Sequence, residues 1–133
     1  MKQIAARIHN GLAWLIFLSS HLAIFLIALS VFGAAAPNVH GAFGRLMWLM
    51  ALLMFIASLL CRHSWRNVGF SFLVFFLLFM QGIFVYMPTF SGVVRAFHGL
   101  NGMAIMWLAY GLARGRVRAT APSSEQLPVT SYQ

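Results

Sequence analysis

The chain has 133 residues, of which 62% are hydrophobic and 8% are charged. This composition excludes a water-soluble globular domain, because most of the chain would expose apolar surface to water. A formal charge of +8 suits a nucleic-acid partner, but the cations flank apolar runs and form no continuous patch interleaved with aromatics, which excludes that class too. The sequence therefore predicts an integral membrane protein in contact with the lipid bilayer.

Four apolar segments follow one another, and each is long enough to cross the hydrocarbon core as an α-helix, which takes about 20 residues. They form one predicted transmembrane domain, residues 1–114, with helices at about residues 11–35, 40–61, 67–86 and 96–113. Short links force neighbouring helices to run antiparallel. We therefore predict an all-α, up-down-up-down four-helix bundle in which the second and fourth helices are diagonal partners.

The basic residues predict the orientation of this bundle. Seven of the nine lysines and arginines lie before the first segment, between the second and third, or after the fourth. These places share one face of the bundle, and the positive-inside rule makes that face cytoplasmic. Both chain ends are thus predicted to be cytoplasmic. Residues 115–133 have too little apolar content to fold and are predicted to form a disordered cytoplasmic tail.

The second and fourth segments begin alike, which suggests a duplicated helix hairpin. One starts at His40 with the sequence HGAFG, and the other starts at His98 with HGLNG. In the preceding segments, His21 lies nineteen residues before His40 and Gln81 lies seventeen residues before His98. We interpret His21 and Gln81 as roughly corresponding positions of the two hairpins.

Few intramembrane residues can carry chemistry. His21, His40, Gln81 and His98 are polar side chains in apolar segments, and each needs a partner or a ligand there. Glu125 in the tail is the only carboxylate of the chain, which excludes carboxylate catalysis, acidic proton relays and sites for hard cations. Because no pair of nucleophile and base is visible either, we do not expect an enzyme that works without a cofactor.

The two helix-starting histidines form the most specific pattern. His40 is followed at i+4 by Gly44, and His98 at i+4 by Gly102, so each imidazole has a flat backbone patch one turn away on the same helix face. A haem ligated by histidine needs such clearance. On parallel, diagonal helices the two imidazoles would approach one iron from opposite sides, which predicts bis-histidine ligation of haem b.

Two arginines near the same outer boundary, Arg45 and Arg95, are candidates to pair with the haem propionates. The alternative to haem is structural. Small residues at i and i+4 are also the ordinary device for close packing of membrane helices, and first-turn histidines can face water and headgroups.

The other polar residues receive plainer interpretations. His21 and Gln81 are expected at similar depth, where they form an interhelical hydrogen bond or line a quinone or ligand pocket. His9 and His63 lie at the cytoplasmic boundary, where we expect them to be solvated. The eight methionines, taken with the histidines, leave copper handling as a further alternative, although methionine commonly fills apolar packing gaps.

These motifs resemble a family of small four-helix bacterial membrane proteins. Its members carry a polar residue in helix one, a His-x-x-x-Gly start to helix two, a glutamine in helix three and a second histidine starting helix four; the matching residues here are His21, His40 with Gly44, Gln81 and His98. The resemblance implies the fold, the topology and a bacterial inner (cytoplasmic) membrane location, and no activity. A looser similarity links the paired histidines to b-type cytochrome bundles.

Two functions are therefore weighed. The first is a haem-b-binding, cytochrome-b-like membrane protein for electron transport, with His40 and His98 as axial ligands and an unnamed redox partner. The alternative is a non-enzymatic accessory subunit of a larger respiratory or photosynthetic membrane complex. Haem requires both histidines to point inward with room between them, whereas the accessory role is compatible with a filled centre.

Overall fold

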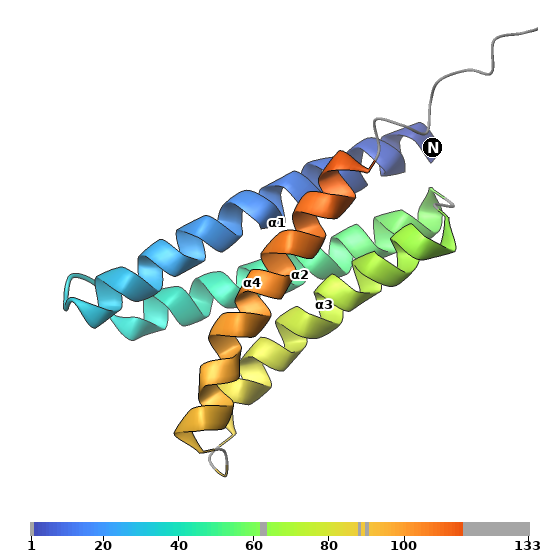
Figure 1. Ribbon diagram of the computed structural model, residues 1–133. Coiled ribbons are helices and arrows are strands. Elements are labelled where there is room, and N and C mark those ends of the chain that lie inside the picture. The colour runs from blue at the N-terminus through green and yellow to red at the C-terminus, as the bar shows by residue number, and fades with distance from the viewer. Residues whose placement is uncertain (1, 62–63, 88, 90, 116–133) are drawn as a thin grey trace, which may run out of the picture.

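The computed structural model describes residues 2–61, 64–87, 89 and 91–115. These residues form four helices, α1 (Lys2–Val31), α2 (Pro37–Leu60), α3 (Trp65–Tyr86) and α4 (Gly92–Arg114). Figure 1 shows the chain turning back after each of the first three helices. The predicted disordered tail lies outside the described residues, apart from Gly115, and so does His63.

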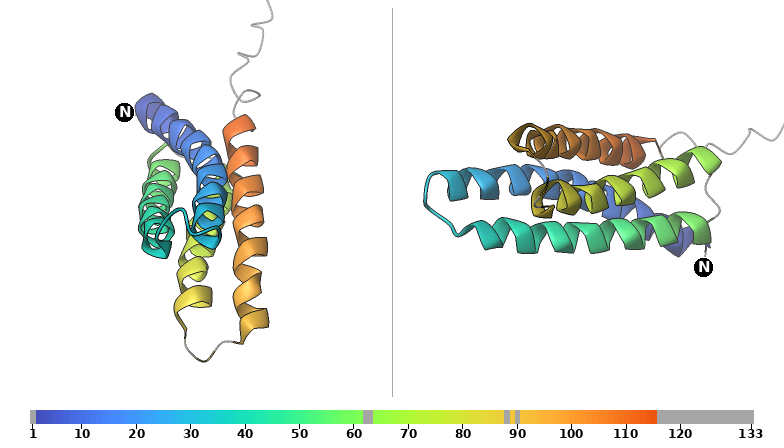
Figure 2. Two further views of the ribbon diagram at one scale, coloured as in Figure 1. Left: turned by 90° about the vertical axis from the view of Figure 1, so that its left-hand side faces the viewer. Right: turned by 90° about the horizontal axis from the view of Figure 1, so that it is seen from below.

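The helices pack as a bundle in ring order. Helix α1 packs against α2 and α4, and α3 packs against the same two helices, while neither α1 and α3 nor α2 and α4 come into direct backbone contact. Figure 2 shows α2 and α4 on opposite sides with α1 and α3 between them. The second and fourth helices are therefore diagonal partners, as the short links predict.

Glycine and proline set the ends of the first two helices. Helix α1 ends at Val31, four residues before the predicted end, because Gly33 adopts a positive φ of 74° and the amide of Ala34 donates back to the carbonyl of Leu29 at 2.8 Å. A left-handed glycine after the last turn is a common helix stop. Pro37, predicted only to separate two segments, lies in the first turn of α2, where its missing N–H costs nothing.

The starts of α1 and α4 also lie earlier than predicted. Helix α1 begins at Lys2 instead of residue 11, since nothing in its first turns interrupts a helix. Helix α4 begins at Gly92 instead of residue 96, and the Ser91 side chain caps it by accepting a hydrogen bond from the amide of Val94 at 3.4 Å. Each helix therefore carries its histidine well inside the element and not in an unsupported first turn.

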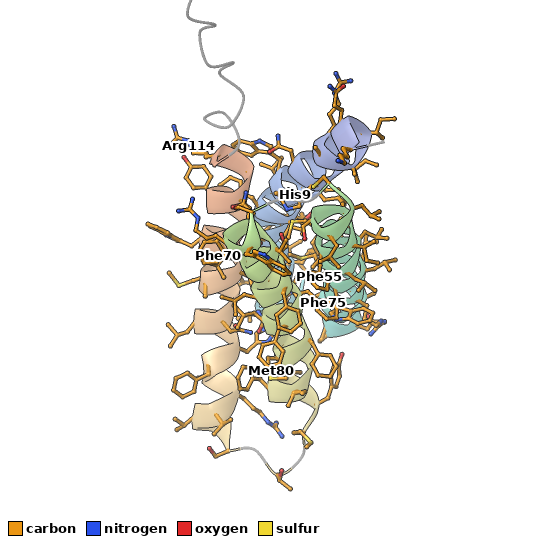
Figure 3. All side chains as sticks on the ribbon, turned by 90° about the vertical axis from the view of Figure 1, so that its right-hand side faces the viewer. His9, Phe55, Phe70, Phe75, Met80 and Arg114 are labelled. Carbon is orange, nitrogen blue, oxygen red and sulfur yellow. The ribbon has the colours of Figure 1, made fainter. Side chains whose placement is uncertain are left out.

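The core is narrow and built partly from small residues. Ala13, Ala51 and Ala109 are fully buried where helices meet, which allows close approach of the backbones. Aromatic rings fill the space between α2 and α3, where Phe55 lies parallel to Phe75 with ring centroids 6.4 Å apart (Figure 3). The core thus occupies the middle of the bundle and leaves both ends to other residues.

The outer surface is largely apolar. Large hydrophobic side chains are exposed along all four helices, including Phe25 at 57%, Leu60 at 65% and Leu100 at 61%. Within the described residues, three helices, α1, α2 and α3, are long and apolar enough to cross a membrane. An apolar surface of this extent is the opposite of what a monomeric soluble protein presents to water.

The two hairpins, α1–α2 and α3–α4, bury equivalent positions. Adding 58 to the numbers of the buried residues of the first hairpin gives buried residues of the second in these pairs: Ala13 and Ser71, Ile16 and Val74, Met47 and Ile105, Ala51 and Ala109, and Met54 and Leu112. The same offset relates His40 to His98. The two histidines therefore occupy equivalent places in two similar halves.

Candidate functional site

His40 on α2 and His98 on α4 face each other across the bundle. Their ring centroids lie 6.0 Å apart with an angle of 67° between the ring planes, and both side chains are half-buried. Because α2 and α4 are diagonal partners without direct backbone contact, the two side chains bridge the centre of the bundle. The structure thus brings together the two residues that the sequence singles out.

Each histidine is held by the helix that precedes it. The Nδ1–H of His40 donates to the carbonyl of Ala23 at 3.0 Å, and the Nδ1–H of His98 donates to the carbonyl of Gln81 at 3.4 Å. A carbonyl oxygen only accepts hydrogen bonds, so each neutral ring must carry its proton on Nδ1. In both histidines Nε2 keeps its lone pair on the ring edge away from the carbonyl.

This arrangement is the one that metal-binding histidines commonly have. A ligating imidazole usually donates its other N–H to a backbone carbonyl or carboxylate, which fixes the tautomer and the ring orientation. Two imidazoles that bind one metal ion from opposite sides, each through a bond of about 2 Å, have centroids about 6 Å apart. A separation of 6.0 Å also suits an edge-to-face pair of rings.

A cavity of about 650 Å³ adjoins the histidine pair and is lined by all four helices. This volume lies in the usual range of small-molecule sites, about 300–1,000 Å³. Figure 1 shows the hairpins α1–α2 and α3–α4 diverging toward their loops, residues 32–36 and 87–91. The cavity lies at this end because the helices separate there.

Glycines keep the cavity open. Five of them line it: Gly41, Gly44, Gly82, Gly99 and Gly102. A Cβ atom at Gly44, Gly82 or Gly99 would meet nothing within 4 Å, so at those positions the missing side chain leaves empty space. At Gly102 it would lie 3.2 Å from Nε2 of Gln81. The predicted clearance at Gly44 and Gly102 is therefore present, and three further glycines add to it.

The two arginines proposed from the sequence differ in position. Arg45 lines the cavity, whereas Arg95 is exposed in the first turn of α4 and lies outside the cavity lining. The prediction that both arginines reach one ligand is therefore wrong for Arg95. Its place in the first turn directs it away from the space between the histidines.

The expected pair of His21 and Gln81 does not form. His21 is exposed, and its Nδ1–H donates to the carbonyl of Phe17 in its own helix at 2.9 Å. Gln81 lines the cavity and His21 does not. The residue that corresponds to Gln81 is Ala23, because both lie 17 residues before a histidine whose Nδ1–H their carbonyl accepts.

A second histidine lies inside the bundle at its opposite end. His9 on α1 is 1% exposed, and its Nε2 lies 2.9 Å from the hydroxyl of Ser71 on α3. Figure 3 shows His9 near the end of the bundle at which Arg114 lies. The expectation that His9 is solvated is therefore wrong. The earlier start of α1 extends the bundle past His9 and encloses it.

Comparisons with protein-family models, with curated proteins and with solved structures find no match. The candidate site is therefore described by its own geometry. Within the described residues, no group of three or more histidine, cysteine, aspartate or glutamate side chains gathers in a metal-binding arrangement. The histidine pair offers two protein ligands, and a metal ion held there needs its remaining ligands from another molecule.

The geometry predicts the tautomer of both histidines. In the ligand-free protein at a pH at which the rings are neutral, His40 and His98 should be protonated on Nδ1. Nitrogen-15 NMR of histidine-labelled protein, assigned with His40→Ala and His98→Ala variants, measures this directly. Protonation of either ring on Nε2 would contradict the carbonyl contacts.

Proposed function

We propose that this chain is a b-type haem-binding membrane protein that transfers electrons, with His40 and His98 as the axial ligands of one haem b. The observation that carries the proposal is the pair itself: two imidazoles from diagonal helices, 6.0 Å apart, each fixed through Nδ1 to a backbone carbonyl. Their free Nε2 atoms are the ligand atoms that iron needs.

Haem supplies what the protein lacks. A tetrapyrrole brings four nitrogen ligands of its own, so two histidines complete an octahedral iron site. The glycine-lined cavity of about 650 Å³ gives the flat macrocycle space beside the backbones of α2 and α4. With both axial positions filled by protein, the iron has no open place for a substrate, which favours electron transfer over catalysis at the metal.

The same proposal places the bundle in a bacterial inner membrane, up-down-up-down, with both chain ends cytoplasmic. The exposed apolar side chains of α1, α2 and α3 support it. Helix α4 has 23 residues and a length of about 35 Å, enough for a hydrocarbon core of about 30 Å. The cations near both termini and between α2 and α3 support the orientation. The resemblance to small four-helix bacterial membrane proteins and the equivalent hairpins fit a duplicated unit.

The proposal is tested by the visible spectrum of the protein purified in detergent from haem-replete cells, oxidised and then reduced with dithionite. We expect a Soret band with sharp reduced α and β bands, as six-coordinate bis-histidine haem gives. The His40→Ala and His98→Ala variants should each lose the bis-histidine spectrum, because one axial ligand is missing. His21→Ala should keep it, because His21 lies outside the cavity.

Circular dichroism and gel filtration of each variant separate loss of haem from loss of the fold. A wild-type protein that stays colourless after haem supplementation would contradict the proposal. It would favour the accessory-subunit function, in which the histidines only pack.

Filling the cavity should displace the haem without unfolding the protein. In Gly44→Leu the new side chain enters empty space on the cavity wall, because a Cβ there meets nothing within 4 Å. We expect haem retained per protein, measured by absorbance, to fall at least tenfold, since about 1.4 kcal/mol of lost affinity suffices.

The matched control is Gly69→Leu on α3. Gly69 is exposed, a Cβ there also meets nothing within 4 Å, and the position lies outside the cavity. This variant should retain full haem. Equal haem content in both variants would show that the cavity does not hold the macrocycle.

A further inference from the structure

Three polar side chains lie close to one level of the cavity, about one helical turn from the histidine pair. Arg45 and Trp48 follow His40 on α2, and Gln81 lies on α3; all three line the cavity. Side chains on helices lean toward the N-terminus of their helix. The Trp48 indole therefore leans back toward the level of Gly44, which is four residues, or about 6 Å, from His40.

Gln81 reaches the same level from the other side. Its Nε2 lies 3.2 Å from the position that a Cβ of Gly102 would occupy, and Gly102 is one turn beyond His98 on α4. Gly44 and Gly102 are equivalent positions of the two hairpins, 58 residues apart. The polar groups of Trp48 and Gln81 thus gather where the two glycines leave room.

Two of these side chains have buried polar atoms with nothing to bind. Nε1 of Trp48 and Oε1 of Gln81 have no hydrogen-bond partner among the described residues. An unmade hydrogen bond at a buried polar atom is costly, and such atoms usually mark a missing ligand or water. Rotation of the Gln81 amide by half a turn presents its N–H₂ group in place of Oε1, so both residues can donate.

Arg45 adds a charge that the described residues do not neutralise. The one carboxylate of the chain, Glu125, lies in the tail and outside the described residues. A guanidinium on the wall of an apolar cavity within a membrane is stabilised by an anion. A donor from tryptophan, an amide and a guanidinium together match a carboxylate, whose oxygens only accept hydrogen bonds.

We infer that Arg45, Trp48 and Gln81 form a subsite for the carboxylate side chains of the tetrapyrrole, and that the protein selects a tetrapyrrole with free carboxylates. This inference rests on the proposed haem function and adds a specificity to it. The carboxylates lie on one edge of the macrocycle, away from the iron, so a ring centred between the histidines can direct that edge toward the level of Gly44 and Gly102.

The test compares iron protoporphyrin IX with its dimethyl ester, which has the same macrocycle and no free carboxylate. Each is titrated into detergent-purified, haem-depleted protein, and the bis-histidine absorption bands report binding. We expect the wild type to bind the free acid about tenfold or more tightly than the ester, the difference that one charge-assisted hydrogen bond provides.

Three variants remove one group each: Arg45→Gln, Trp48→Phe and Gln81→Met. Each should bind the free acid more weakly, by about tenfold for Arg45→Gln, and bind the ester as the wild type does. The matched controls change the same residue types outside the cavity: Arg95→Gln, Trp107→Phe and Gln3→Met. They should keep the preference for the free acid.

Equal wild-type affinity for both compounds, with bis-histidine spectra, would overturn the carboxylate subsite and leave the haem function intact. An equal loss of acid and ester binding in the three variants would also overturn it, because the residues would then act only through packing. Absence of a bis-histidine spectrum with either compound would overturn the proposed function itself, and the subsite with it.

Discussion

The hydrogen bond from each histidine to the carbonyl of the preceding helix is the interaction on which the site depends. It joins α1 to α2 through His40 and Ala23, and α3 to α4 through His98 and Gln81. In an apolar surrounding a free imidazole N–H is costly, so these bonds hold the rings in one orientation. Because α2 and α4 are diagonal, two equivalent bonds direct two equivalent rings toward the centre of the bundle.

Packing at the two ends of the bundle then divides the molecule. In the middle, buried alanines let the helices approach, and at the far end His9 joins α1 to α3 through Ser71. Toward the loops the hairpins diverge, and glycines replace the side chains that would otherwise fill the space. The tightly packed end fixes the frame, and the open end offers a binding site.

The sequence predicts the four helices, the diagonal pairing and the histidine pair with its glycines, because apolar length, short links and a local repeat each depend on few residues. It misplaces His21, because the counting from His40 and His98 was allowed to differ by two residues; a constant offset of 58 would have selected Ala23. The capture of a carbonyl by His40 leaves no side-chain signal at Ala23. The roles of Arg95 and His9 depend on where helices begin, which the composition defines poorly.

The central claim is that one iron lies between His40 and His98. Crystals of the haem-loaded protein, measured at the iron absorption edge, test this most directly through the anomalous difference map. The account predicts a single strong peak between the two Nε2 atoms, about 2 Å from each, the usual length of a metal–imidazole bond. A peak away from this pair, or imidazoles packed against each other with no iron in the bundle, would contradict it.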